Sequence, residues 1–86
     1  MNRYDRLMHL LLAAFPGAAI SLFDDSESHA SHQHGFSGET HYRVQMKHSA
    51  FAGLTALQKH RLILAAIRPE TDAGMHSFVI DSATEA

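Results

Sequence analysis

The chain has 86 residues, of which 45% are hydrophobic, and its formal net charge is −2 with histidine neutral. This length suits one small domain over residues 1–86, and the hydrophobic fraction is too high for a disordered chain. The slightly negative total charge provides no general attraction to nucleic acid or to anionic lipid.

The chain contains no cysteine and eight histidines. Disulfides, thiolate zinc sites and a self-contained iron–sulfur cluster are therefore excluded, and any metal held by this chain alone must bind histidine nitrogen or carboxylate oxygen. No segment reaches the roughly 18 apolar residues of a membrane span, and the first 15 residues do not resemble a signal peptide. We expect a cytoplasmic protein that does not bind membranes.

The first half of the chain predicts a helix, a strand, a long loop and a second strand. Asn2 is a suitable N-cap for a helix over residues 2–15, and Pro16-Gly17 ends it. A short apolar run over residues 18–23 predicts a strand. Residues 25–38 predict a long loop, a length that usually indicates function or disorder. Polar and apolar residues then alternate over residues 41–47, as in a strand with one face in solvent.

The second half predicts a turn, a helix and a final strand. Phe51 is expected to anchor the turn over residues 49–53 in the core. Thr55 and Gln58 have the spacing of a capping box, and Pro69 stops the helix after about Ile67. A loop over 68–74 and a strand over 75–80 follow, and residues 82–86 are expected to fray. The predicted apolar face of the helix consists of Ala56, Leu57, His60, Ile63, Leu64 and Ile67. His60 is thereby predicted to be a half-buried core histidine.

The order helix–strand–strand–helix–strand predicts a two-layer α+β domain, with both helices on one face of a three-stranded mixed sheet. The first two strands should pair antiparallel through the loop. The helical crossover should make the second and third strands parallel, so both begin at the same edge. The second strand begins at His41, where the loop ends, and the third begins close to His76. Connectivity alone therefore predicts that His76 lies near the loop histidines His29, His32 and His34.

A cluster of neutral imidazoles suits a borderline or soft metal, although a loop rich in serine and histidine can also be simply solvated. No pattern fixes a nucleophile, a base and an orienting carboxylate together, so the sequence predicts no catalytic residues and no enzymatic activity. The glycine spacing of Gly35–Gly38 matches a KH-domain clamping loop. It lies between strands instead of helices, and we interpret the match as accidental.

Five segments, in this order and spacing, resemble the BolA family over residues 3–82. They are D-D-S at Asp24–Ser26, G-E-T-H-Y-R-V at Gly38–Val44, S-A-F-A-G-L at Ser49–Leu54, K-H-R-L-I at Lys59–Ile63, and Met75-His76 before an apolar strand. The resemblance implies a fold similar to class II KH domains. It also implies a monothiol glutaredoxin as partner, with a [2Fe–2S] cluster shared between glutaredoxin cysteine, glutathione and BolA histidines.

The resemblance assigns His76 as the C-terminal ligand and leaves the loop ligand open. Counting forward from Asp25-Ser26 selects His29, counting back from His41 selects His32, and His34 is a third candidate. The absence of cysteine matches the subtype with histidine in the loop. The chain departs from the family at Lys59, at Ser77-Phe78 and at Lys47-His48, and the last pair makes the end of the second strand more basic.

Two alternatives to an iron–sulfur adaptor remain open. Some BolA proteins are linked to transcription, and a KH-like DNA-binding regulator would place basic residues against phosphates. The candidates are Lys47, His48, Lys59, Arg61 and Arg68. Because the total charge is slightly negative, a solvated surface of mixed charge is the simpler interpretation of these residues. The second alternative is simple zinc or copper buffering by the loop.

Overall fold

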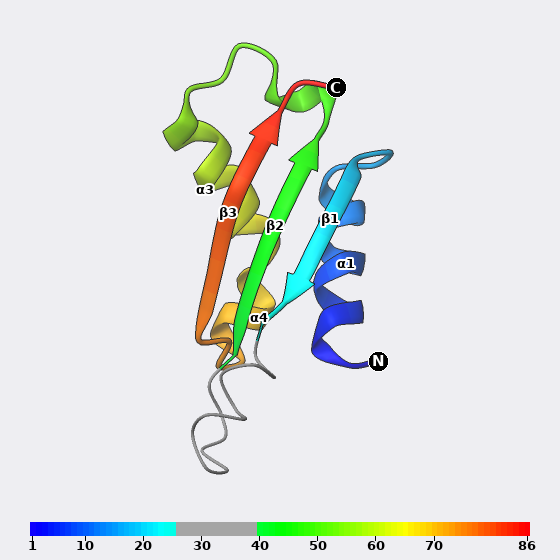
Figure 1. The fold of residues 1–86 in the computed structure, drawn as a ribbon, viewed down its shortest axis with the longest axis vertical. Coiled ribbons are helices and arrows are strands. Elements are labelled where there is room, and N and C mark those ends of the chain that lie inside the picture. The colour runs from blue at the N-terminus through cyan, green and yellow to red at the C-terminus, as the bar shows by residue number, and fades with distance from the viewer. Residues whose placement is uncertain (26–39) are drawn as a thin grey trace.

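The computed structural model describes residues 1–25 and 40–86, which form one sheet with helices on one of its faces (Figure 1). The elements in chain order are α1 (Arg3–Ala14), β1 (Ala19–Asp24), β2 (His41–Lys47), η1 (Ser49–Phe51), α3 (Ala56–Ala66), α4 (Arg68–Asp72) and β3 (Ser77–Thr84). The strand order is β1-β2-β3, with β1 antiparallel and β3 parallel to β2. The predicted α+β architecture and both strand pairings are confirmed.

Side chains close the N-terminal ends of both long helices, as the sequence predicts. The Asn2 side chain accepts a hydrogen bond from the Asp5 backbone N–H at 2.8 Å. At the start of α3, Thr55 Oγ1 accepts from the Gln58 N–H at 3.1 Å, and Gln58 Oε1 accepts from the Thr55 N–H at 2.8 Å. This reciprocal pair satisfies two N–H groups that the helix itself cannot satisfy.

Replacing Thr55 with alanine is expected to lower the free energy of unfolding by about 1 kcal/mol, because the Gln58 N–H loses its acceptor. Urea denaturation monitored by circular dichroism measures this loss. Thr71→Ala is the matched control, since Thr71 is exposed within α4 and caps no helix. An equal loss in both variants would contradict the capping role.

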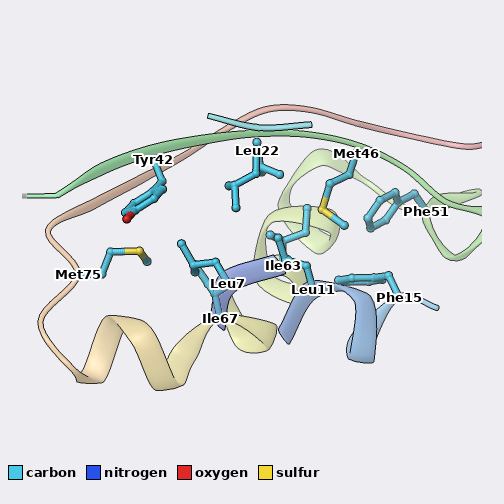
Figure 2. Close-up of a cluster of buried hydrophobic side chains, with 11 residues drawn as sticks. Leu7, Leu11, Phe15, Leu22, Tyr42, Met46, Phe51, Ile63, Ile67 and Met75 are labelled. Carbon is cyan, nitrogen blue, oxygen red and sulfur yellow. The ribbon is translucent and has the colours of Figure 1, made fainter. Parts of the chain in front are cut away.

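The hydrophobic core lies between the sheet and the helices (Figure 2). Val44 of β2 and Leu7 and Leu11 of α1 are fully buried at its centre. Phe51 of η1 is 1% exposed and contacts Phe15 at a ring-centroid distance of 5.2 Å. The predicted role of Phe51 as a core anchor is confirmed.

The predicted apolar face of α3 is wrong by part of a turn. His60 is exposed and Leu57 is 56% exposed, whereas Ile63 and Ile67 are fully buried and Lys59 is half-buried. Leucines lie on more than one side of this helix, so hydrophobic periodicity alone does not select the side that faces the sheet. The interpretation of His60 as a core histidine is therefore incorrect.

The end of the chain also differs from the prediction. The expected loop over 68–74 contains the short helix α4, and β3 runs from Ser77 to Thr84. The pairing with β2 shifts between Val44 and Gln45, so that Asp81 is an extra residue in β3, as in a β-bulge. The bulge changes the alternation of the strand and lets Ala83 pack against the core. The expectation of a frayed tail is consequently wrong for residues 82–84.

None of the helices in the described part of the chain could cross a membrane.

Candidate metal centre

Two histidines meet where β2 and β3 begin. The sheet register pairs His41 with Ser77, so His76 lies one residue before this paired position. The His41 and His76 rings contact each other edge to face, with centroids 5.4 Å apart and an interplanar angle of 67°. His76 therefore lies at the end of the sheet where segment 26–39 joins β2, as strand connectivity predicts. The candidate ligands His29, His32 and His34 lie outside the described residues.

Backbone contacts fix the position of His76. Its N–H donates to Thr40 Oγ1 at 2.7 Å, and the Ser77 N–H donates to the Thr40 carbonyl at 2.8 Å. On the other side of the site, the Asp25 N–H donates to the His41 carbonyl at 2.8 Å. The imidazole of His76 is exposed, and within residues 1–25 and 40–86 neither of its ring nitrogens is in a hydrogen bond. The fold thus fixes the backbone of His76 and leaves its ring accessible.

Replacing Thr40 with valine is expected to accelerate amide hydrogen exchange at His76 about fivefold, because one net hydrogen bond is lost. Hydrogen exchange followed by NMR measures this rate. The Ser77 amide is an internal control, since its acceptor is the Thr40 carbonyl and remains in place. Thr40→Ser retains the hydroxyl and should leave the His76 rate near that of the wild type. An unchanged rate in Thr40→Val would show that the hydroxyl does not hold this residue.

Arg43 links all three strands on the face of the sheet opposite the helices. Its Nε donates to Asp25 Oδ2 at 2.7 Å and one terminal nitrogen donates to Asp81 Oδ2 at 2.8 Å. The guanidinium also lies 4.5 Å from the centroid of the Phe23 ring. The hydrogen bonds to Asp25 and then to Asp81 raise the pKa of Arg43, so the arginine keeps its charge at any relevant pH. Arg43 thereby ties the residue that precedes segment 26–39 to β3.

A buried carboxylate holds the segment that leads to His76. Glu70 is 5% exposed, and its two oxygens accept hydrogen bonds from Arg3 Nε and Arg6 Nε, both at 2.9 Å. The hydrogen bond from Arg6 is the main cause that lowers the pKa of Glu70, Arg3 adds to it, and burial opposes it. The Glu70 carbonyl accepts from the Met75 N–H at 3.0 Å. Glu70 therefore connects α1 to the residue just before His76.

Tyr42 lies next to His41 on β2 and points into the core (Figure 2). Burial is the main cause that raises the pKa of its hydroxyl, and the Asp24 carboxylate adds to the effect. Tyr42 therefore stays neutral at physiological pH and acts as a packing residue at this end of the sheet.

The four lysine and arginine candidates for nucleic-acid binding do not share one surface, and the ring of the fifth candidate, His48, contacts Phe15. Lys47 ends β2 and Arg68 begins α4, at opposite ends of the fold (Figure 1). Lys59 lines a hollow together with Asp81 of β3. Arg61 and Arg68 line a second hollow, and Arg68 Nε lies 3.8 Å from Asp72 Oδ2. DNA binding therefore stays a prediction that no contiguous basic surface of the described residues supports.

Potential ligands gather only in pairs within the part of the chain that the structure describes. No group of three or more histidine, cysteine, aspartate or glutamate side chains is placed there to hold a metal ion. At the start of β2 and β3, the described residues place two potential ligands in contact, His76 and His41. The sequence predicts the position of His76 at this end of the sheet, but it does not predict the contacts of Thr40, Arg43 and Glu70, whose partners are distant in sequence.

Comparison with known proteins decides the family. The model of the BolA-like protein family matches residues 11–86. The chain belongs to the BolA family. A Sinorhizobium protein of the cobS 5′ region is 39% identical over 85 residues, which cover 96% of this chain and 91% of the relative. The UV-induced protein uvi31 of Schizosaccharomyces pombe is 33% identical over 87 residues, covering 95% and 84%.

A solved BolA domain has the same arrangement of elements. The BolA domain of SufE1 from Arabidopsis thaliana superposes with a TM-score of 0.80 at 28% identity, covering 98% of this chain and 93% of that chain. The BolA fold thus accounts for the order of the elements and for the parallel pairing of β2 with β3, which begins next to His76.

Proposed function

We propose that the chain is a non-enzymatic iron–sulfur adaptor that shares a [2Fe–2S] cluster with a monothiol glutaredoxin. The observation that carries this proposal is the position of His76. Its exposed ring lies at the end of the sheet where segment 26–39 rejoins β2, and its backbone is held by Thr40. An accessible imidazole on a fixed backbone is suited to complete a coordination sphere that another molecule begins.

The donor chemistry of the chain fits a shared cluster. The chain has no cysteine, so glutaredoxin and glutathione would supply the thiolates and this chain would supply neutral imidazoles. His76 is one of these ligands, and His29, His32 or His34 is the second. When bound, a cluster with imidazole in place of thiolate has a higher reduction potential, as in Rieske centres.

The direct test is a spectroscopic titration of the protein into a monothiol glutaredoxin that carries a glutathione-ligated [2Fe–2S] cluster. We expect the visible absorption and circular dichroism to change to a new spectrum that saturates at a fixed ratio of the two proteins. The cluster-loaded glutaredoxin without this chain is the reference. A spectrum equal to that of the reference at all ratios would refute the adaptor function.

The same titration identifies the loop ligand. Three variants, His29→Ala, His32→Ala and His34→Ala, each remove one candidate imidazole. If one of these residues is the ligand, only its variant should lose the mixed spectrum, and the other two should behave as the wild type. If all three variants retain the mixed spectrum, the proposal that one of these histidines is the loop ligand is wrong.

A further inference from the structure

His48 connects three parts of the fold. It directly follows the last residue of β2, is half-buried, and caps the start of η1. Its Nε2 lies 2.8 Å from the carbonyl oxygen of Pro16, and its Nδ1 lies 3.0 Å from the backbone nitrogen of Ala50. The side chain therefore joins the end of β2 and the start of η1 to the turn that follows α1.

These two contacts are compatible with one protonation state of the ring. The Pro16 carbonyl can only accept a hydrogen bond, so Nε2 must carry a proton and donate it. The Ala50 N–H can only donate, so Nδ1 must carry no proton and accept. The ring that forms both hydrogen bonds is thus the neutral Nε2–H tautomer. A second proton, on Nδ1, would place the ring N–H against the Ala50 N–H, and two donors cannot bond to each other.

The same ring packs against the aromatic end of the core. Its centroid lies 5.7 Å from that of Phe15 and 6.2 Å from that of Phe51, and both contacts are edge to face. Phe51 belongs to η1, the element that His48 caps. Turning the ring away from Ala50 would also move Nε2 and change these contacts. A proton on Nδ1 therefore acts on the short helix that anchors this end of the core.

Two charged residues adjoin His48 on the elements packed against it. Lys47 precedes it on β2 and is exposed, and Glu85 follows the Thr84 carbonyl, which accepts from the His48 N–H at 2.9 Å. No side chain of η1 can titrate, and the last titratable residue of α1 is His9, in the middle of that helix. The group that distinguishes the two protonation states of His48 by direct contact is the Ala50 N–H.

We propose that His48 is a pH-sensitive latch of this fold. Histidine is the side chain whose charge ordinarily changes between pH 5 and pH 8. The neutral ring holds η1 to the turn after α1, and the protonated ring releases the Ala50 N–H and loosens the turn that carries Phe51. β2 begins at His41 and ends at Lys47, so the latch and the candidate metal centre lie at opposite ends of the strand (Figure 1). The inference is therefore independent of the proposed cluster.

NMR of the full-length protein between pH 8 and pH 5 tests the latch. Long-range ¹H–¹⁵N spectra show which nitrogen of the His48 ring carries a proton, and we expect the Nε2–H tautomer at pH 8. Hydrogen exchange gives the protection of the Ala50 amide relative to an unstructured amide at the same pH. This protection should fall about fivefold as the ring is protonated, the equivalent of one net hydrogen bond, and with the midpoint of the ring titration.

Controls separate titration of His48 from a general effect of acid. The Gln58 amide has the Thr55 hydroxyl as its acceptor and should keep its protection over this range. His9→Ala removes an exposed histidine of α1 and should leave the pH dependence at Ala50 as in the wild type.

Two substitutions of His48 isolate its role as an acceptor. In His48→Asn the side-chain oxygen can accept from the Ala50 N–H at any pH, as asparagine does at the N-caps of helices, so Ala50 should stay protected at pH 5. His48→Ala has no acceptor and should show low protection at both pH 8 and pH 5. The comparison of wild type with His48→Asn is decisive even if His48→Ala does not fold.

Any of four results would overturn the inference. They are a proton on Nδ1 in place of Nε2 at pH 8, a His48 ring that stays neutral down to pH 5, protection of Ala50 that does not follow the ring titration, and an equal loss of this protection in wild type and His48→Asn.

Discussion

Replacing His76 with alanine is expected to reduce the mixed spectrum formed with cluster-loaded glutaredoxin to the spectrum of glutaredoxin alone. His76 is the proposed ligand whose position the structure describes, and Thr40 fixes its backbone at the end of the sheet. If the proposed cluster is shared, His76 would hold one iron atom through its imidazole, and the alanine side chain offers no ligand in its place. Visible circular dichroism measures the loss, because its signal reports the ligand arrangement around the iron atoms.

The control for this prediction is His60→Ala, which removes an exposed histidine on α3, away from the site. It should retain the wild-type spectrum. Both variants should also keep the wild-type melting temperature within a few degrees, because exposed side chains contribute little to stability. A wild-type spectrum from a folded His76→Ala protein would remove His76 from the ligand set, even if the two proteins still bind each other.

The topology could be predicted from the sequence because it depends on local signals. Asn2 and Thr55 begin helices, alternation over residues 41–47 defines a strand, and a helical crossover determines that β2 and β3 run parallel. The position of His76 beside His41 follows from this connectivity. Chain order alone therefore predicts that His76 lies at the end of the sheet where β2 and β3 begin, and this position is confirmed.

The parts that could not be predicted depend on contacts between distant residues. Glu70 pairs with Arg3 and Arg6, which are 67 and 64 residues away, and no local pattern indicates that a glutamate after Pro69 is buried. Arg43 likewise meets carboxylates 18 and 38 residues away.

The prediction of which side of α3 faces the sheet is wrong for a different reason. Leucines on several sides of the helix give similar hydrophobic periodicity for more than one orientation, and packing of Ile63 and Ile67 decides between them.

Replacing Glu70 with glutamine is expected to lower the melting temperature at pH 7 by roughly 10 °C, a large effect for a single substitution in a domain of this size. The amide keeps the shape of the side chain but removes the negative charge between Arg3 and Arg6. The backbone carbonyl of Glu70 accepts a hydrogen bond from the Met75 N–H. Weaker attachment of the residue 70 side chain to Arg3 and Arg6 should therefore also loosen the turn that leads to His76. Thermal denaturation measures the first effect, and hydrogen exchange at Met75 measures the second.

The pH dependence of this difference separates the buried ion pairs from a general effect of charge. The pKa of Glu70 is lowered in the folded protein, so its stabilisation is fully present above the unperturbed value near 4.3 and is lost as pH falls through the lower, folded value. The melting temperatures of wild type and Glu70→Gln should therefore differ by a constant amount between about pH 7 and pH 5 and converge under more acidic conditions. Asp72→Asn removes the same charge from an exposed position of α4 and should stay close to wild type throughout. Parallel curves for wild type and Glu70→Gln down to pH 2 would show that the difference does not come from the charge of Glu70, since a contribution from this charge must disappear when the carboxylate is protonated.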